Sequence, residues 1–348
     1  MTEDPSSSRP GGTATRQAEA ENIRQILRQG STGKFTENDM LKRKPIDISI
    51  VRHLYPFKSH YIDLNGLKYH YVDEGRGEPV VMVHGNPTWS FYFRDLIKAL
   101  DGKYRVIAPD HIGCGLSDKP DSQTYGYRLK NRVDDLDVFL ESLKLKEEIT
   151  LILHDWGGFI GMAYALRYPQ RIGRIILMNT AAFLPPAGKP IPIILKLIRS
   201  VKPLATLAVQ GFNLFALGAV HKNSYPGLAR DVKAGLIAPY NCWQNRIATL
   251  KFVQDIHLVE NNPSYGLVKK VDNRLKLFSN LPILICWGEH DFVFDLDYLS
   301  EWQRRFPDAE VHRFPDAGHY VLEDASEKII PLVQQFLIQH RLEANAPS

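Results

Sequence analysis

The chain has 348 residues, of which 44% are hydrophobic and 24% are charged, and its formal net charge is +4. These values are ordinary for a globular protein with a full core, so they exclude a chain that is disordered throughout, and the scattered Lys and Arg residues give no indication of nucleic-acid binding. Three widely spaced cysteines and an N-terminus without an apolar run favour a cytoplasmic protein with no disulfide and no structural zinc.

The first part of the chain differs in amino-acid composition from the rest. Residues 1–45 are rich in Ser, Pro, Gly and charge, which predicts a disordered tail with one short amphipathic helix around 21–27. HYIDLNGLKYHYVDEG, residues 60–75, then predicts a β-hairpin that turns at Asn65 and Gly66.

Strand-like and helix-like segments alternate after the hairpin. Residues 130–143 have apolar side chains at helical spacing. The segments expected to be strands are 79–84, 105–110, 150–155, 174–179, 282–291 and 310–314. This alternation predicts an α/β fold with a mostly parallel central sheet and helices on both faces, in which ligands bind beyond the carboxyl ends of the strands.

About a hundred residues between the strands at 174–179 and 282–291 carry no strand pattern. A loop of that length without structure is uncommon, so we expect a folded helical cap over 184–280, inserted into a core made of 46–183 and 281–348. The segment 204–220 is unusually apolar. It is interpreted as a helix packed between cap and core, as the lining of a cavity for a long alkyl substrate, or as a membrane-surface contact.

LILHDWGGFIGMAYA, residues 151–165, predicts a strand that turns sharply into a helix, with Asp155 at the turn. Gly157 and Gly158 permit such a turn, which is the nucleophile elbow of α/β hydrolases, although Leu153 replaces the first small residue of that motif and Asp155 replaces serine. An ionised aspartate needs no base to become a nucleophile, so it can displace a leaving group from a tetrahedral carbon and form an ester.

Two later residues complete a triad in the order nucleophile, acid, histidine. His319 is the expected base that activates water to cleave the ester, and Asp291 is expected to orient His319 and to stabilise its cation. Asp295 and Asp297 follow closely and remain alternatives to Asp291.

Five motifs stand in order: HGNPTW (84–89), PDHIGCGLSD (109–118), HDWGG (154–158), WGEHDFVF (287–294) and DAGHY (316–320). Together they resemble the haloalkane dehalogenase family of α/β hydrolases, from about Tyr55 to the last helix. The resemblance implies a haloalkane dehalogenase-like hydrolase in which Asn86 and Trp156 bind the halide leaving group. Their backbone N–H groups would form the oxyanion hole for ester hydrolysis.

Other activities stay open. Segments such as YPFKSHYIDLNGLKYHYVDEG and APYNCWQNRIATLKFVQDI resemble the third dehalogenase subfamily, whose close relatives include β-lactone decarboxylases of long-chain olefin synthesis. That resemblance implies an alkyl lactone as the alternative substrate, a carboxylate in place of a halide as the leaving group, and assembly into homo-oligomers or complexes with other enzymes of the pathway.

An epoxide hydrolase would use the same aspartate together with cap tyrosines, for which Tyr225, Tyr240 and Tyr265 are the candidates. A non-catalytic binding module is the remaining alternative. The sequence has no metal, nucleotide or flavin motif, so we expect no cofactor and, as partners, a small apolar or long-chain alkyl substrate and water, without nucleic acid.

Overall fold

The computed structural model describes residues 44–146, 148–186, 189, 202–256, 260 and 262–342, and one compact unit spans 43–348. The expected tail, with its short helix at 21–27, lies outside the described residues apart from its last two positions. Lys44 and Pro45 are described, and their backbone carbonyls accept hydrogen bonds from the side chains of Asn245 and Asn241.

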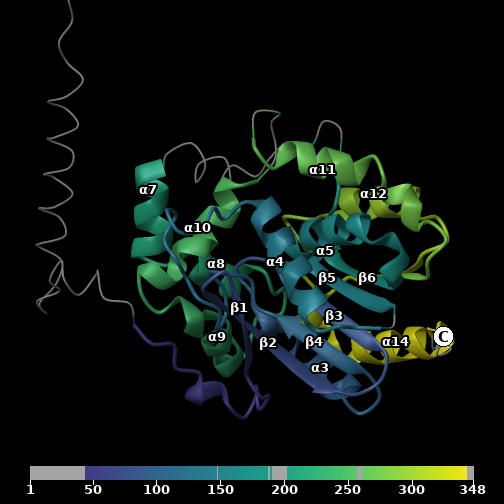
Figure 1. Ribbon diagram of the computed structural model, residues 1–348, viewed down its shortest axis with the longest axis horizontal. Coiled ribbons are helices and arrows are strands. Elements are labelled where there is room, and N and C mark those ends of the chain that lie inside the picture. The colour runs from purple at the N-terminus through teal and green to yellow at the C-terminus, as the bar shows by residue number, and fades with distance from the viewer. Residues whose placement is uncertain are drawn as a thin grey trace, which may run out of the picture. The chain divides into compact units, whose positions relative to one another are not determined.

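The described residues form one eight-stranded sheet in the order β1-β2-β4-β3-β5-β6-β7-β8. Strand β2 is antiparallel to both of its neighbours, and the other neighbouring pairs are parallel, which confirms the expected mostly parallel sheet (Figure 1). The strands are β1 (His60–Leu64), β2 (Leu67–Gly75), β3 (Pro79–Val83), β4 (Arg105–Pro109), β5 (Ile149–Asp155), β6 (Ile172–Thr180), β7 (Ile283–Gly288) and β8 (Glu310–Phe314).

The expected hairpin is confirmed in detail. Strands β1 and β2 are joined by Asn65 and Gly66, whose φ angles are 55° and 85°. Two successive positive φ angles suit the right-handed twist of a two-residue hairpin, and Asn followed by Gly is the pair that adopts them at least cost.

Alternate residues along the strands pack on opposite faces of the sheet, as the two-residue period of a strand requires. Val81 and Leu151 belong to one apolar cluster, whereas Val80 and Ile152 belong to the other. The first face is covered by α4 (Leu129–Ser142), α5 (Trp156–Arg167), α11 (Tyr265–Asp272) and α12 (Leu296–Arg305). The second face is covered by α3 (Arg94–Leu100), α13 (Val321–Asp324) and α14 (Ser326–Gln339).

Between β6 and β7 the described residues form helices and no strand. They are α7 (Lys202–Thr206), the π-helix η4 (Leu207–Gly211), α8 (Leu214–Lys222), α9 (Arg230–Ile237), α10 (Ile247–Gln254) and α11, with short 3-10 turns at Ala238–Tyr240, Gln244–Arg246 and Leu275–Phe278. Helix α11 packs with α5 in the layer on the sheet. The boundaries of 184–280 stay a prediction, and residues 202–256 are called the cap below.

Two positions at the start of α5, Gly157 and Gly161, have no room for a side chain. A Cβ atom at Gly157 would lie 1.9 Å from the backbone oxygen of Val83, and one at Gly161 would lie 2.3 Å from a methyl carbon of Leu153. Gly161 therefore makes the space that Leu153 fills, which explains how this elbow accommodates leucine where the motif has a small residue.

Gly157→Ala is expected to destabilise the fold by at least about 2 kcal/mol, because the new methyl group collides with strand backbone that cannot rotate away. Gly218→Ala is the matched control, since nothing lies within 4 Å of a Cβ there and alanine favours the helix. Urea unfolding followed by circular dichroism compares the two. An equal midpoint for both variants would contradict the tight approach.

Candidate active site

Asp155 is the last residue of β5, at the carboxyl end of the sheet, and its φ and ψ angles are 50° and −124°. A positive φ is strained for a residue with a side chain, and such strain is typical of functional turns. The side chain makes no capping hydrogen bond to α5. The backbone N–H of Asn86 donates to its Oδ2 at 2.6 Å, which holds the carboxylate at the turn.

Burial raises the pKa of Asp155 to about 6, because the surrounding protein disfavours the charged form. His319 and the backbone N–H groups of Asn86 and Trp156 act in the opposite direction and favour the carboxylate. At neutral pH the group is therefore mostly ionised while it remains poorly solvated, and such a carboxylate is a reactive nucleophile.

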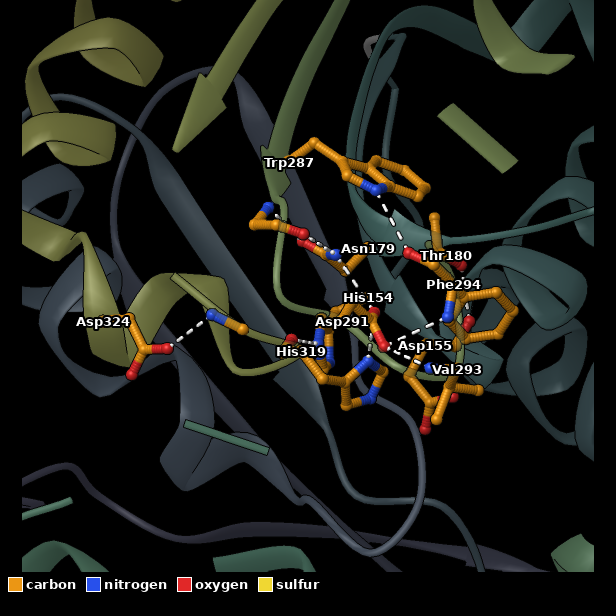
Figure 2. Close-up of polar contacts among 12 residues, drawn as sticks. His154, Asp155, Asn179, Thr180, Trp287, Asp291, Val293, Phe294, His319 and Asp324 are labelled. Atoms are coloured by element: carbon orange, nitrogen blue, oxygen red, sulfur yellow. Dashed lines mark hydrogen bonds and ion pairs between the residues drawn. The ribbon is translucent and has the colours of Figure 1, made fainter. Parts of the chain in front are cut away.

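His319 and Asp291 form a buried pair. The Nδ1 atom of His319 lies 2.7 Å from Oδ2 of Asp291, while the other carboxylate oxygen accepts the backbone N–H groups of Val293 and Phe294 at 2.7 and 3.0 Å. Figure 2 shows Asp291 between these donors and the imidazole. His319 follows β8 and Asp291 follows β7, so both reach the same edge of the sheet as Asp155.

The two alternative acids lie elsewhere. Asp295 and Asp297 both pair with Lys189, and Asp295 also caps α12. Of the three candidate aspartates, the structure places Asp291 against His319.

The charge state of His319 depends on its carboxylate neighbours. Burial alone would lower the pKa of His319, but Asp291 and, more weakly, Asp155 favour the cation and hold that pKa above its ordinary value. The site therefore stabilises an imidazolium next to the nucleophile, which is the state that a general base reaches after it takes a proton from water.

Asn179 supports the pair and was not predicted from the sequence. It is the residue before the last of β6 and has a φ of 35°, and its Nδ2 donates to Oδ2 of Asp291 and to the oxygen of Gly288, both at 3.0 Å. Its own oxygen accepts the N–H of Gly288 at 2.8 Å. A polar residue that ends an otherwise apolar strand was the available signal, because the same signal identified Asp155.

Asn86 and Trp156, the two expected leaving-group donors, flank Asp155 in different ways. The carboxamide of Asn86 donates to the carbonyl of Thr249 in α10 at 3.2 Å, so one of its two N–H bonds binds the cap. Trp156 packs against Phe252 and Phe159 with ring centroids 5.2 and 5.7 Å apart. Both residues are buried beside Asp155, and their part in leaving-group binding stays a prediction.

Arg132 is a buried cation close to this group. Its guanidinium carbon lies 3.6 Å from the ring centroid of Phe252 and 5.8 Å from that of Trp156. A cation at such distances is attracted to the electron-rich face of the ring. The sequence pattern did not identify it, although an arginine among the apolar positions of the predicted helix at 130–143 was a signal that could have been used.

Two carboxylates fasten the cap to the site. Asp324 accepts hydrogen bonds from the backbone of Gly318, beside His319, and from Ser224 and Tyr225 at the end of α8. Asp255, at the end of α10, accepts the backbone N–H of Leu129 at the start of α4 at 2.7 Å. The loop that carries His319 and the cap are therefore positioned by shared side chains.

The candidate epoxide tyrosines have other contacts. Tyr225 is 56% exposed and stacks on His290 with centroids 3.7 Å apart. The hydroxyl of Tyr240 donates to the oxygen of Thr88 at 3.4 Å, and the ring of Tyr265 faces Lys269. The contacts found for these tyrosines within the described chain do not include Asp155.

Comparison with known proteins gives a consistent result. The model of the α/β-hydrolase fold matches residues 78–203 and 223–326. A cis-3-alkyl-4-alkyloxetan-2-one decarboxylase of Shewanella oneidensis is 51% identical over 291 residues, which cover 82% of this chain and 90% of that protein. Haloalkane dehalogenase 2 of Mycobacterium bovis is 31% identical and covers 82% of this chain and 96% of its own length.

A solved structure resembles the fold closely. The haloalkane dehalogenase DatA from Agrobacterium tumefaciens superposes with a TM-score of 0.73 at 26% identity, covering 81% of this chain and 96% of DatA.

Asp291→Asn is expected to lower the pKa of His319 by about one unit or more, because it removes the carboxylate that most favours the imidazolium. An NMR titration of the labelled histidines measures the shift. Asp295→Asn is the control, since that residue pairs with Lys189, and it should leave the pKa of His319 in place. Equal pKa values in the two variants would mean that Asp291 does not set the charge of His319.

Proposed function

The chain belongs to the α/β-hydrolase family as a haloalkane dehalogenase-like member, and from that membership and its buried aspartate we propose that it decarboxylates cis-β-lactones that carry two alkyl chains. The observation that carries the proposal is the 51% identity to a cis-3-alkyl-4-alkyloxetan-2-one decarboxylase over nine-tenths of that protein's length. The site geometry supports it, because a nucleophilic carboxylate suits displacement at a tetrahedral ring carbon.

In the first step, an oxygen of Asp155 attacks the ring carbon that bears the lactone oxygen. A new bond forms between that carbon and Asp155 while the ring carbon–oxygen bond breaks and leaves a carboxylate. The configuration of the carbon inverts. Relief of the strain in the four-membered ring favours this displacement over attack on an unstrained ester.

In the second step, the bond between the neighbouring carbon and the new carboxylate breaks and releases carbon dioxide. Its electron pair forms the carbon–carbon double bond, while the bond to Asp155 breaks and regenerates the aspartate. Inversion followed by elimination from the anti arrangement leaves chains that were cis on the ring on the same side of the alkene. The cycle consumes no water and requires no net proton transfer.

The departing carboxylate needs electrostatic stabilisation while it forms. The side-chain N–H groups of Asn86 and Trp156 are the proposed donors. The His319 cation that Asp291 favours supplies a positive charge beside Asp155. In this reaction His319 acts through its charge, because no water has to be deprotonated.

Haloalkane hydrolysis is the second candidate, favoured by the 31% identity to a haloalkane dehalogenase. The same displacement would expel a halide, but the resulting ester has no carboxylate to lose. Water must then cleave that ester with neutral His319 as its base. The two reactions therefore share Asp155 and differ in their need for His319 as a base.

A cytoplasmic location and assembly with further copies or pathway enzymes remain parts of the proposal.

The direct test supplies the purified protein with a long-chain cis-β-lactone and, separately, with 1-bromobutane, and follows olefin and bromide. We expect faster olefin formation than bromide release, and loss of both in Asp155→Ala, because both reactions begin at this carboxylate. Bromide without olefin would make haloalkane hydrolysis the activity. Unchanged olefin formation in Asp155→Ala would refute the proposed nucleophile.

The two reactions should also differ in pH dependence. Olefin formation requires ionised Asp155, so on acidification kcat/KM should fall about tenfold per pH unit below about pH 6, the pKa to which burial raises this group. At alkaline pH it should fall again, because the His319 cation that stabilises the departing carboxylate is lost. Steady-state bromide turnover also requires neutral His319, whose pKa is raised, so it should decline at a higher pH as the medium is acidified. Coincident profiles would contradict the charge role given to His319.

A further inference from the structure

Large apolar side chains gather on the outside of the cap. Leu204 of α7 is 55% exposed, and Phe212, Leu214 and Leu217, at the corner between η4 and α8 and along α8, are 54%, 56% and 36% exposed. Single exposed apolar residues are normal on soluble proteins, but four within fourteen residues of sequence indicate a contact surface. These four residues are called the cap patch, and Figure 1 shows α7, α8 and α10 grouped beside one another.

The opposite sides of the same helices are well packed. Ala216, Ala219 and Val220 of α8 are buried, while Leu214, Leu217 and His221 recur at helical spacing on the exposed face. Ala205 and Val209 pack with Leu250 and Val253 of α10. The exposed leucines are therefore the outer face of a folded element.

In the described chain, a bilayer-spanning length and composition is not found in any single helix. Pro203–Gly211 and Leu214–Lys222 reach it only together, with a bend of 65° between them. Because one side of this pair packs against α10 in the rest of the cap, only the other side is available to contact lipid. A helix pair with one apolar face outward suits the surface of a membrane.

Charge in this region is mainly positive. No acidic residue occurs from Trp156 to Arg230. The cap has two acidic residues, Asp231 and Asp255, of which Asp255 is buried. Its six basic residues are Lys202, Lys222, Arg230, Lys233, Arg246 and Lys251. The excess of positive charge therefore lies in the part of the chain that carries the patch, as expected for attraction to anionic headgroups.

An aromatic residue borders the patch. Trp243 lies 3.5 Å from the position of a Cβ on Gly211, the neighbour of Phe212, and its backbone oxygen accepts a hydrogen bond from Gln210. Its side chain is partly exposed. Tryptophan is enriched at the level of the headgroups, where its ring meets hydrocarbon and its N–H meets water.

We propose that the cap patch docks on the surface of an anionic phospholipid bilayer. Phe212, Leu214 and Leu217 enter the boundary between headgroups and acyl chains, and the exposed cations Lys222 and Arg230 attract the phosphates. A second copy of this chain is a poorer occupant, because it would bring the same positive charge against the patch. The inference stands on the surface alone, although a lactone with two alkyl chains would itself partition into lipid.

Vesicle co-sedimentation of the full chain without substrate tests the proposal, with vesicles of phosphatidylglycerol and phosphatidylcholine in equal parts. We expect binding that weakens at high salt. The triple change Phe212→Ser, Leu214→Ser and Leu217→Ser should reduce partitioning more than about tenfold, because each of these partly exposed apolar side chains contributes roughly a threefold gain when its exposed part leaves water and the three gains multiply.

The matched control changes three apolar residues elsewhere, Ile50→Ser, Val138→Ser and Leu277→Ser, which are comparably exposed. The control should bind vesicles like the unchanged chain, and thermal melting checks that both triple variants are folded. Absence of binding by the unchanged chain, or an equal loss in the control, would overturn the proposal. Equal binding to pure phosphatidylcholine would refute the role of charge.

Light scattering tests whether the patch instead joins two copies of the chain. If the cap-patch variant forms a smaller oligomer than the unchanged chain, and the unchanged chain does not bind vesicles, the patch is a contact between copies and the lipid proposal fails. Vesicle binding is measured without turnover, so a failed lactone assay leaves it intact. Release of bromide from soluble 1-bromobutane should be the same in the cap-patch variant, because that substrate does not need a membrane.

Discussion

A carboxylate buried at a turn is the constraint on which the rest of the site depends. Asp155 must keep its charge at neutral pH in surroundings that raise its pKa to about 6. It must also hold a backbone conformation that residues with a side chain rarely adopt. The N–H of Asn86 and the cation favoured at His319 compensate for the lost water, while Gly157 lets α5 approach β3 closely.

The cap and the core meet through side chains that the site already uses. Asn86 faces Asp155 with its backbone and α10 with its carboxamide. Asp324 holds both the loop before His319 and the chain after α8. Displacement of the cap would therefore disturb Asp155 and His319 together. Movement of the cap is thus coupled to the positions of both side chains.

Periodicity and turn residues predicted most of the fold. The hairpin at Asn65 and Gly66 and the parallel strands lie within a few residues of their expected positions, because each is specified by local sequence. The choice of Asp291 over Asp295 was not available from sequence, since three aspartates lie within seven residues and the register of β7 against β8 selects among them. Asn179 and Arg132 were missed because their partners come from other elements.

Leu153 and Gly161 form a complementary pair whose consequence concerns redesign. Conversion of this elbow to the serine motif would require serine at 155 and a small residue at 153. Loss of the leucine side chain would leave a cavity against Gly161, because the leucine fills the space beside that glycine. Reintroduced volume at 161 would then be needed in the same step. The packing around Asp155 is thus specific to this elbow, and exchange of aspartate for serine there requires correlated substitutions at 153 and 161.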